Sequence, residues 1–262
     1  MTILKEIVYN LIAPVLRVWL RNSITGKPIK DTHKVLYYDR SQHLGFLFSR
    51  KIEYEKEFSA IIMQHMKPGN LVFEIGSNIG QYSLQIAEKI GENGKLICVE
   101  PDSDNFAMLS FNILKNGCKN VELVNEAVAD RQGHTTFYKD TMTGGRMGSL
   151  IREYSGTHFQ GKSEEVKTTT LGILIDQYGI PDFVKVDVEG AEDLIFNDAS
   201  SIHSHTIYLI EVREETKASI FEVFNSLGFF MYLLESNLKK VEHVSDIPGF
   251  ANLLIKHPPT TI

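Results

Sequence analysis

The chain has 262 residues, of which 43% are hydrophobic and 23% are charged, and its net charge is −6 at pH 7. This composition is ordinary for a globular protein and excludes a fibrous or disordered chain, and the negative charge gives no general attraction to nucleic acid. Cys98 and Cys118 are too few for a disulfide framework or a cysteine-rich zinc site, so we expect a reducing, cytoplasmic location.

The N-terminal segment, residues 3–20, is rich in apolar residues but is interrupted by Lys5, Glu6, Pro14 and Arg17. It therefore falls short of the roughly 20 unbroken apolar residues that cross a bilayer, and it lacks the cleavage site of a signal peptide. We favour a helix that packs on the domain or on a second subunit of a homo-oligomer. The alternative is a peripheral helix that rests on a membrane surface.

Residues 1–50 are predicted to form an N-terminal extension that consists of this helix and a hairpin. Strands at 35–39 and 44–49 are expected to pair around a polar turn, and an amphipathic helix is expected over 52–66. Residues 51–262 are expected to form one domain in which strands and helices alternate. Strands are predicted at 71–75, 95–99, 121–125, 134–138, 166–170, 183–186, 206–212, 229–233 and 251–256, and helices at 81–90, 105–116, 191–196 and 217–227. This order is typical of an α/β fold with a mostly parallel sheet and helices on both faces.

The stretch 71–80 is a strand that runs into a glycine turn and opens a helix. Gly76 and Gly80 allow a ligand to approach the backbone, and Glu100 follows twenty positions after Gly80, at the end of the second strand. This spacing is typical of an adenosyl site in which the second acid accepts hydrogen bonds from ribose hydroxyls. A pyrophosphate loop needs a glycine where this chain has Asn78, so the pattern favours an adenosyl cofactor without phosphates. S-adenosyl-L-methionine is the common one.

Glu74, Asn78, Pro101 and Ala127 are further candidate cofactor contacts. Glu74 is expected to accept hydrogen bonds from the cofactor ammonium, with bonding to turn amides as the alternative. Asn78 can adopt a positive φ or offer its amide to the cofactor carboxylate. Pro101 stiffens the turn after Glu100, and Ala127 follows the third strand, where the adenine edge is usually recognised.

Three segments together resemble the FkbM family of S-adenosylmethionine-dependent methyltransferases. They are Phe73-Glu-Ile-Gly-Ser-Asn-Ile-Gly80, Val99-Glu-Pro101 and Val184-Lys-Val-Asp-Val-Glu-Gly-Ala-Glu192, and the resemblance runs from roughly residue 55 to 240. Glu74 and Ser77 stand where the family usually has Asp and Ala. The resemblance implies a Rossmann-like class I methyltransferase fold with a seven-stranded, mostly parallel sheet and a final antiparallel strand. It also implies O-methylation of a hydroxyl on a sugar, glycan or related small molecule.

The carboxylates Asp187, Glu189 and Glu211 end the fourth and fifth strands and are the candidate catalytic residues. Methyl transfer depends mainly on alignment, and a hydroxyl also needs a base to take its proton. Asp187 and Glu211 can alternatively hold Mg²⁺, although no sequence pattern supports a metal. A structural role in ordering the Gly190 turn is the alternative for Asp187 and Glu189, and Arg213 can pair with Glu211.

A long polar segment, residues 139–165, is predicted to be a loop that covers the acceptor. Long loops at the carboxyl ends of parallel strands are commonly functional. Within it, Arg146 is a candidate for binding an anionic group, and His158 is a second candidate substrate contact.

Two other functions remain open at this point. The strand, turn and helix with Glu100 also suit an NAD(P)-dependent oxidoreductase, although Asn78 and the missing Tyr-x-x-x-Lys relay disfavour it. A non-catalytic cofactor-binding scaffold is the third possibility, and the acids at 74, 100 and 187 argue against it.

Overall fold

The computed structural model describes residues 18–21, 23–44, 46, 50–52, 56–140, 145–155 and 159–258. Most of the predicted N-terminal helix lies outside these residues. Of its described part, Val18 and Trp19 are exposed. Whether this segment packs on protein or on a membrane therefore stays a prediction, and so does the division of the chain at residue 50.

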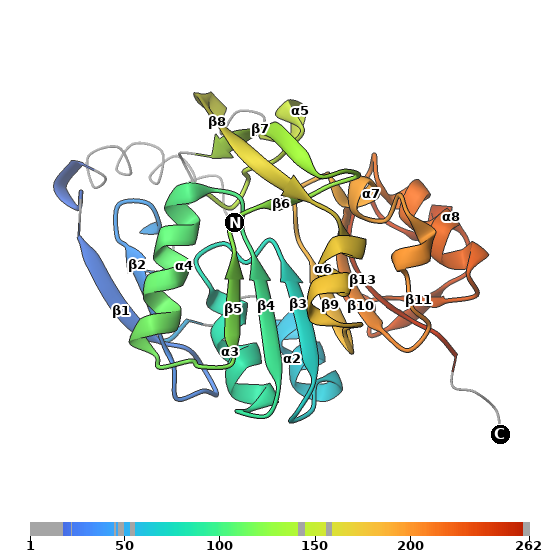
Figure 1. The fold of residues 1–262 in the computed structure, drawn as a ribbon, viewed down its shortest axis with the longest axis horizontal. Helices are drawn as coiled ribbons and strands as arrows, with labels where there is room; N and C mark the ends of the chain where they lie inside the picture. The colour runs from blue at the N-terminus through green and yellow to red at the C-terminus, as the bar shows by residue number, and fades with distance from the viewer. Residues whose placement is uncertain are drawn as a thin grey trace.

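One eight-stranded sheet forms the centre of the molecule (Figure 1), in the order β12-β11-β13-β10-β9-β3-β4-β5. The five strands from β10 to β5 are parallel to one another, and β13, β11 and β12 follow as antiparallel neighbours. Seven strands give the predicted class I methyltransferase sheet, and the short β12 adds an eighth at the edge. The bounds are β3 (Leu71–Ile75), β4 (Lys95–Val99), β5 (Val121–Val124), β9 (Phe183–Val186), β10 (Ile207–Arg213), β11 (Phe230–Leu233), β12 (Lys239–Val241) and β13 (Phe250–Lys256).

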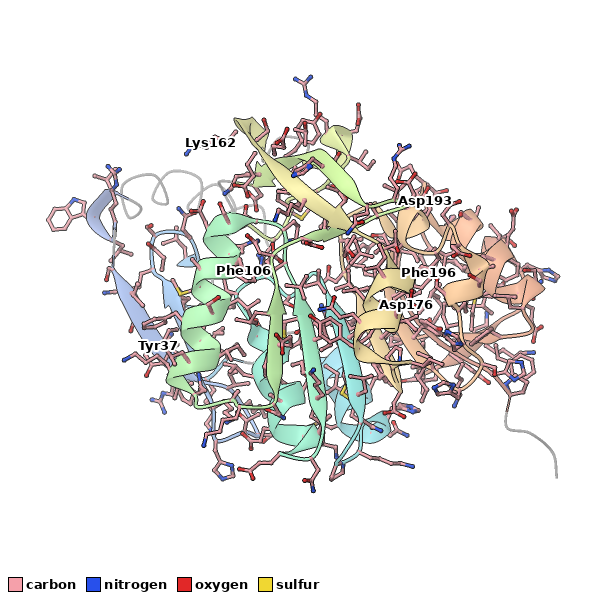
Figure 2. The ribbon with its side chains drawn as sticks, viewed as in Figure 1. Tyr37, Phe106, Lys162, Asp176, Asp193 and Phe196 are labelled. Atoms are coloured by element: carbon pink, nitrogen blue, oxygen red, sulfur yellow. The ribbon has the colours of Figure 1, made fainter. Side chains whose placement is uncertain are left out.

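Helices cover both faces of this sheet, as predicted. Successive strand residues point to opposite faces, so Val72 and Phe73 belong to different apolar clusters. The Val72 cluster includes residues of α2 (Lys56–His65), α3 (Gln81–Ile90) and α4 (Ser103–Lys115). The Phe73 cluster includes residues of α6 (Leu171–Tyr178), α7 (Glu192–Ile195) and α8 (Lys217–Ser226). The latter cluster contains Phe196, which is labelled in Figure 2. The ring of Phe196 lies 5.1 Å from that of Phe224.

A second, three-stranded sheet stands over the carboxyl ends of the parallel strands (Figure 1). It contains β6 (Ala127–Val128), β7 (Gly133–Asp140) and β8 (Phe159–Thr169), with the short helix α5 (Arg152–Ser155) between β7 and β8. The prediction of a loop over 139–165 is therefore partly wrong. Residues 159–165 extend β8 because they pair with the outer half of β7. Two 3₁₀ turns, η3 (Ala199–Ser201) and η4 (Val244–Asp246), also lie in the described residues.

The N-terminal hairpin differs from its prediction. Its second strand, β2 (Val35–Asp39), pairs with β1 (Ile24–Pro28), a strand that was not predicted. Leu44 and Phe46 lie in a helical turn, which the hydrogen bond from the Phe46 amide to the His43 carbonyl supports. The other positions of the predicted strand lie outside the described residues.

Asn112 of α4 and Asn116, the residue that caps the C-terminal end of this helix, join the hairpin to the domain. Asn112 is fully buried; its carboxamide accepts from the Tyr37 amide at 2.7 Å and donates to the Tyr37 carbonyl at 2.9 Å. Asn116 forms the same pair of bonds with Val35, both at 2.8 Å. Tyr37 lies beside α4 in Figure 2. Its ring meets that of Phe111 edge-on. The hairpin is thus hydrogen-bonded to a helix of the central fold.

Candidate functional site

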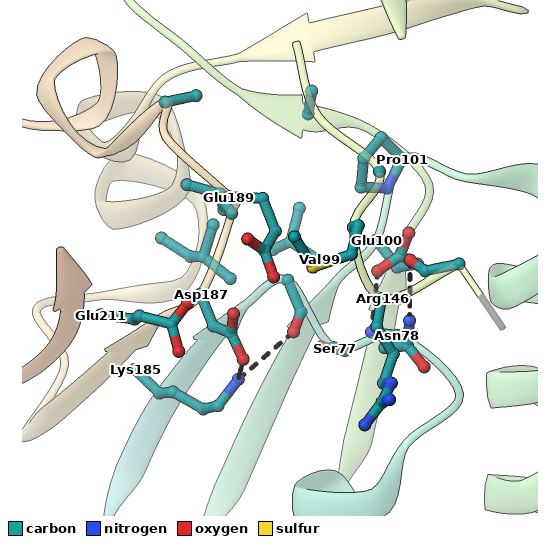
Figure 3. Close-up of a pocket in the computed structure, with 18 of the residues that line it drawn as sticks. Ser77, Asn78, Val99, Glu100, Pro101, Arg146, Lys185, Asp187, Glu189 and Glu211 are labelled. Carbon is teal, nitrogen blue, oxygen red and sulfur yellow. Dashed lines mark hydrogen bonds and ion pairs between the residues drawn. The ribbon is translucent and has the colours of Figure 1, made fainter. Parts of the chain in front are cut away.

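A cleft of about 320 Å³ opens at the carboxyl ends of β3, β4, β9 and β10 (Figure 3). Figure 3 shows two groups of polar side chains in it, with Glu100 and Asn78 on one side and Asp187, Glu189, Glu211 and Lys185 on the other. Because parallel strands end at one edge, residues distant in sequence meet there. The predicted residues that line the cleft are Gly76, Asn78, Glu100, Pro101, Ala127, Arg146, Asp187, Glu189 and Glu211.

The glycine turn after β3 is shaped by close backbone contact. Gly76 has a φ of 82°, and a Cβ atom there would lie 1.8 Å from the Asp187 carbonyl oxygen. Only glycine fits such a contact. Asn78 also has a positive φ, of 49°, as predicted for this turn, and Gly80 has a φ of 91° where α3 begins.

Glu100 is held at the base of the cleft by main-chain donors. Its carboxylate accepts from the Asn78 amide at 2.7 Å and from the Asp102 amide at 2.9 Å. Burial raises the pKa of Glu100 to about 8, the Asp102 carboxylate adds to the rise, and the two amide donors offset part of it. A carboxylate fixed in this way can still accept from ligand hydroxyls, because each oxygen has two acceptor positions.

Glu74 lies away from the cleft. It is completely buried, and its carboxylate accepts from the Ser83 hydroxyl and contacts the Cys98 thiol. Burial raises its pKa, and the Lys185 ammonium, 3.9 Å away, works in the opposite direction. Glu74 is not among the residues that line the cleft, so the predicted contact with a cofactor ammonium has no counterpart in this arrangement.

Lys185 is a cleft residue that the sequence did not single out. It is 1% exposed, and its ammonium lies 3.3 Å from the Asp187 carboxylate and 3.3 Å from the Gly76 carbonyl. The rings of Tyr82 and Phe58 lie 5.2 and 5.7 Å away. In the sequence, a lysine between apolar residues of a buried strand indicates a functional position, because a buried charge needs a partner. Lys185 joins the glycine turn to the carboxylates.

The carboxylates Asp187, Glu189 and Glu211 converge, with one oxygen of each within 4.8 Å of the others. Arg213 bridges two of them: the same Nη2 donates to Glu189 and, at 3.1 Å, to Glu211. The predicted pairing of Arg213 with Glu211 is therefore confirmed. Within the described residues this is the one acidic cluster with the spacing of a metal site, but a cation there would compete with the arginine.

Glu189 combines an unusual backbone with a perturbed carboxyl. Its φ is 56°, and its carbonyl accepts from the buried Ser149 hydroxyl at 2.7 Å. Burial raises its pKa to about 8, the Asp187 charge adds to the rise, and Arg213 opposes it. The amide of Gly190 donates to Glu192 at 2.8 Å, so Glu192 has the turn-ordering role that was the alternative for Asp187 and Glu189.

The segment after β7 lies across the cleft from the carboxylates. Arg146 is exposed and lines the cleft. The adjacent Gly145 carbonyl accepts from the Asn78 carboxamide at 3.1 Å, which ties this segment to the glycine turn. His158, the other predicted substrate contact, lies outside the described residues.

Five aromatic or imidazole side chains that line the cleft were also missed by the sequence reasoning: His43, Phe46, Tyr82, Phe137 and Phe250. His43 and Phe46 come from the segment after β2, and Phe250 begins β13, with the Arg213 guanidinium 4.8 Å from its ring centre. Their types are common in apolar cores, so composition alone gives no sign of a site role.

In the part of the chain that the structure covers, every helix is too short or too polar to pass through a bilayer.

Several solved structures resemble the chain at low sequence identity. A precorrin-6y C5,15-methyltransferase from Geobacter metallireducens is 13% identical over 79% of this chain and 90% of that chain, with a TM-score of 0.46. An S-adenosylmethionine-dependent O-methyltransferase from Thermotoga maritima is 13% identical over 84% and 71%, with a TM-score of 0.47. A fibrillarin from Aeropyrum pernix with natively bound S-adenosyl-L-methionine is 13% identical over 76% and 73%, with a TM-score of 0.44.

No curated protein matches the chain in sequence. The model of the methyltransferase FkbM domain matches residues 74–236, which is more than half of the chain and includes both polar groups of the cleft.

Proposed function

The chain belongs to the FkbM methyltransferase family, and from this premise we propose that it transfers a methyl group to a hydroxyl of a sugar, glycan or related small molecule. The enzyme is an S-adenosylmethionine-dependent methyltransferase. Family membership removes the support for a nicotinamide-dependent oxidoreductase, whose pyrophosphate loop Asn78 already disfavoured.

The residues of one side of the cleft fit S-adenosylmethionine. Gly76 leaves room where a side chain would collide with the backbone of Asp187, and Glu100 presents a fixed carboxylate for ribose hydroxyls. Pro101 and Ala127 line the same side and suit the adenine. When bound, the cofactor supplies a methyl group activated by its sulfonium.

The observation that carries the proposal is the group of three carboxylates in the same cleft as Glu100 (Figure 3). Asp187 is the one member that Arg213 does not hold, and its side chain is 29% exposed. We assign it as the base that would accept the hydroxyl proton as the methyl group passes from the sulfonium sulfur to the hydroxyl oxygen, with the carbon–sulfur bond broken and S-adenosylhomocysteine left. Glu189 and Glu211, fixed by Arg213, accept hydrogen bonds from neighbouring hydroxyls and orient the acceptor.

A polyhydroxylated acceptor suits this chemistry better than a nucleic acid. Carboxylates are the common acceptors for hydroxyl donors, whereas a phosphate backbone would be repelled by them and by the net charge of −6. Both described cysteines are free, and we place the reaction in the reducing cytoplasm. A homo-oligomer stays a prediction.

The test is methyl transfer from isotopically labelled S-adenosylmethionine to a panel of sugars, methyl glycosides and oligosaccharides, followed by mass spectrometry. We expect labelled O-methyl products, and Asp187→Asn should lower kcat by roughly 10²-fold or more while the dissociation constant of S-adenosylhomocysteine stays within about twofold. Asp176→Asn, on the outer side of α6, is the control. Transfer to nitrogen or to RNA alone would contradict the proposal, and absence of turnover with intact cofactor binding would favour a scaffold.

A further inference from the structure

His43 brings an imidazole from the N-terminal hairpin segment into the cleft. It follows β2 in the chain, well before the family-matched residues 74–236, and it lines the cleft together with Phe46. Only 8% of His43 is exposed. A residue outside the matched region therefore forms part of the wall around the ligand site.

The position of the His43 ring is fixed by its neighbours. Phe46 stacks on it with a centroid distance of 5.6 Å and an interplanar angle of 8°, and Tyr38 meets it edge-on at 6.0 Å. Its Nδ1 lies 3.2 Å from the Asp39 carbonyl oxygen. Because a carbonyl only accepts, Nδ1 carries the hydrogen of this bond.

The opposite nitrogen is then a hydrogen-bond acceptor. Burial lowers the pKa of His43 to about 4, and the charge of Arg146 lowers it further, against the opposing effects of Asp39 and Asp140. The ring is neutral at pH 7, so Nε2 carries a lone pair. This atom is buried and has no hydrogen-bond partner among the residues that the structure covers. A buried polar atom without a partner is rare in folded proteins and needs a specific explanation.

The hairpin is held in a fixed relation to the cofactor turn. Asn112, which binds both backbone groups of Tyr37, also donates to the Ile79 carbonyl at 2.8 Å. One buried side chain thus connects β2 with the glycine turn between Gly76 and Gly80. His43, four residues beyond Asp39, is consequently positioned by the same framework that positions the cofactor site.

We propose that Nε2 of His43 accepts a hydrogen bond from an O–H or N–H group of a ligand bound in the cleft, so that the N-terminal hairpin completes the ligand site. The donor group belongs either to the cofactor or to the hydroxylated acceptor. The identity of these two ligands rests on the proposed function. In both cases His43 is a ligand-positioning residue, because a ring with a pKa of about 4 accepts the hydrogen bond without taking up the proton.

The direct test is ¹⁵N NMR of the full chain labelled at histidine, with the His43 signals identified by their loss in His43→Gln. Hydrogen bonding to an unprotonated imidazole nitrogen moves its resonance upfield. A shift on addition of S-adenosylhomocysteine assigns the donor to the cofactor. A shift that needs S-adenosylhomocysteine together with methyl glucoside, methyl galactoside and methyl mannoside assigns it to the acceptor. No shift in either titration overturns the inference.

Variants provide a second measurement. His43→Leu removes the acceptor and should weaken binding of the ligand that shifts the His43 signal by about tenfold, whereas His43→Gln retains an oxygen acceptor and should lose less. His205→Leu, at an exposed position, is the control. If wild-type protein does not bind S-adenosylhomocysteine at all, the proposed function fails; if it binds and His43→Leu binds and turns over equally well, only this inference fails.

Discussion

At the residue scale, the proposed contact of Glu100 with the cofactor ribose predicts a cofactor affinity that depends on pH. Its pKa of about 8 means that the carboxyl is largely protonated at pH 7 in the free enzyme. In the proposed site, ribose hydroxyls donate to the ionised carboxylate, so we expect the cofactor to bind better after the proton has left. The affinity for S-adenosylhomocysteine should therefore rise with pH by up to about tenfold per unit below 8 and level off above it.

Isothermal titration between pH 6.5 and 9 measures this dependence for wild type and for Glu100→Gln. The variant, which cannot ionise at position 100, should bind more weakly at pH 9 and show a nearly flat profile. Equal slopes for the two proteins would assign the pH dependence to another group, such as Glu189, whose pKa is also about 8.

Arg213 leads to a prediction about metal dependence. Its guanidinium already donates to Glu189 and Glu211, two of the three carboxyl groups with metal-site spacing. A divalent cation would have to displace a permanently charged partner that is 21% exposed. We therefore expect that the carboxyl groups bind no divalent cation that EDTA could remove. The rate of methyl transfer should stay within about twofold after treatment with EDTA. Activity that EDTA abolishes and Mg²⁺ restores would show that the carboxylates hold a metal.

At the element scale, the turn between β3 and α3 depends on a contact that no side chain permits. Gly76→Ala would add a Cβ atom 1.8 Å from the Asp187 carbonyl oxygen, at a φ of 82°. The left-handed conformation alone costs about 1–2 kcal/mol, and the forced displacement of backbone adds roughly 1–3 kcal/mol. The variant should also lose cofactor affinity, because the shift moves the turn that faces the ligand.

Gly117→Ala is the matched control for this substitution. Gly117 has a φ of 62°, but nothing lies within 4 Å of the position that a Cβ atom would take there. In chemical denaturation, the free energy of unfolding should therefore fall only by the cost of placing alanine in the left-handed conformation. Binding of S-adenosylhomocysteine should be unchanged. Equal losses of stability in both variants would mean that the contact with Asp187 relaxes freely.

At the scale of the whole molecule, the hairpin and the central domain are predicted to unfold as one unit. Asn112→Ala removes three hydrogen bonds and leaves the backbone groups of Tyr37 and Ile79 without this partner. Each buried group left unsatisfied costs roughly 1–3 kcal/mol. Urea denaturation should show a single unfolding transition, and the free energy of unfolding should fall by an amount in that range or above it. Asn225→Ala, at an exposed position near the end of α8, should change stability by no more than about 0.5 kcal/mol.

Local patterns predicted the central elements closely. The ranges 71–75, 81–90 and 95–99 coincide with β3, α3 and β4, because an apolar run between glycine-rich turns is decided by neighbours in sequence. The pairing of β2 with β1 was missed, because the choice of partner strand depends on contacts between separate segments of the chain and not on the local composition of one segment. The α6 helix was also missed, where Gly172 interrupts the first turn after its Thr170 N-cap.

The amino-acid sequence by itself determined the α/β class, the glycine turn, the place of Glu100 at the end of the second strand and the family of the chain, because these depend on residue types at short, fixed spacings. Only the tertiary structure decided which side chains face the cleft. Glu74 shares the strand face of Val72 and points to Ser83 and Cys98, while Arg213 and His43 reach the cleft from distant elements. Side-chain direction follows from strand alternation and long-range packing, and neither is visible in the spacing of residues along a chain.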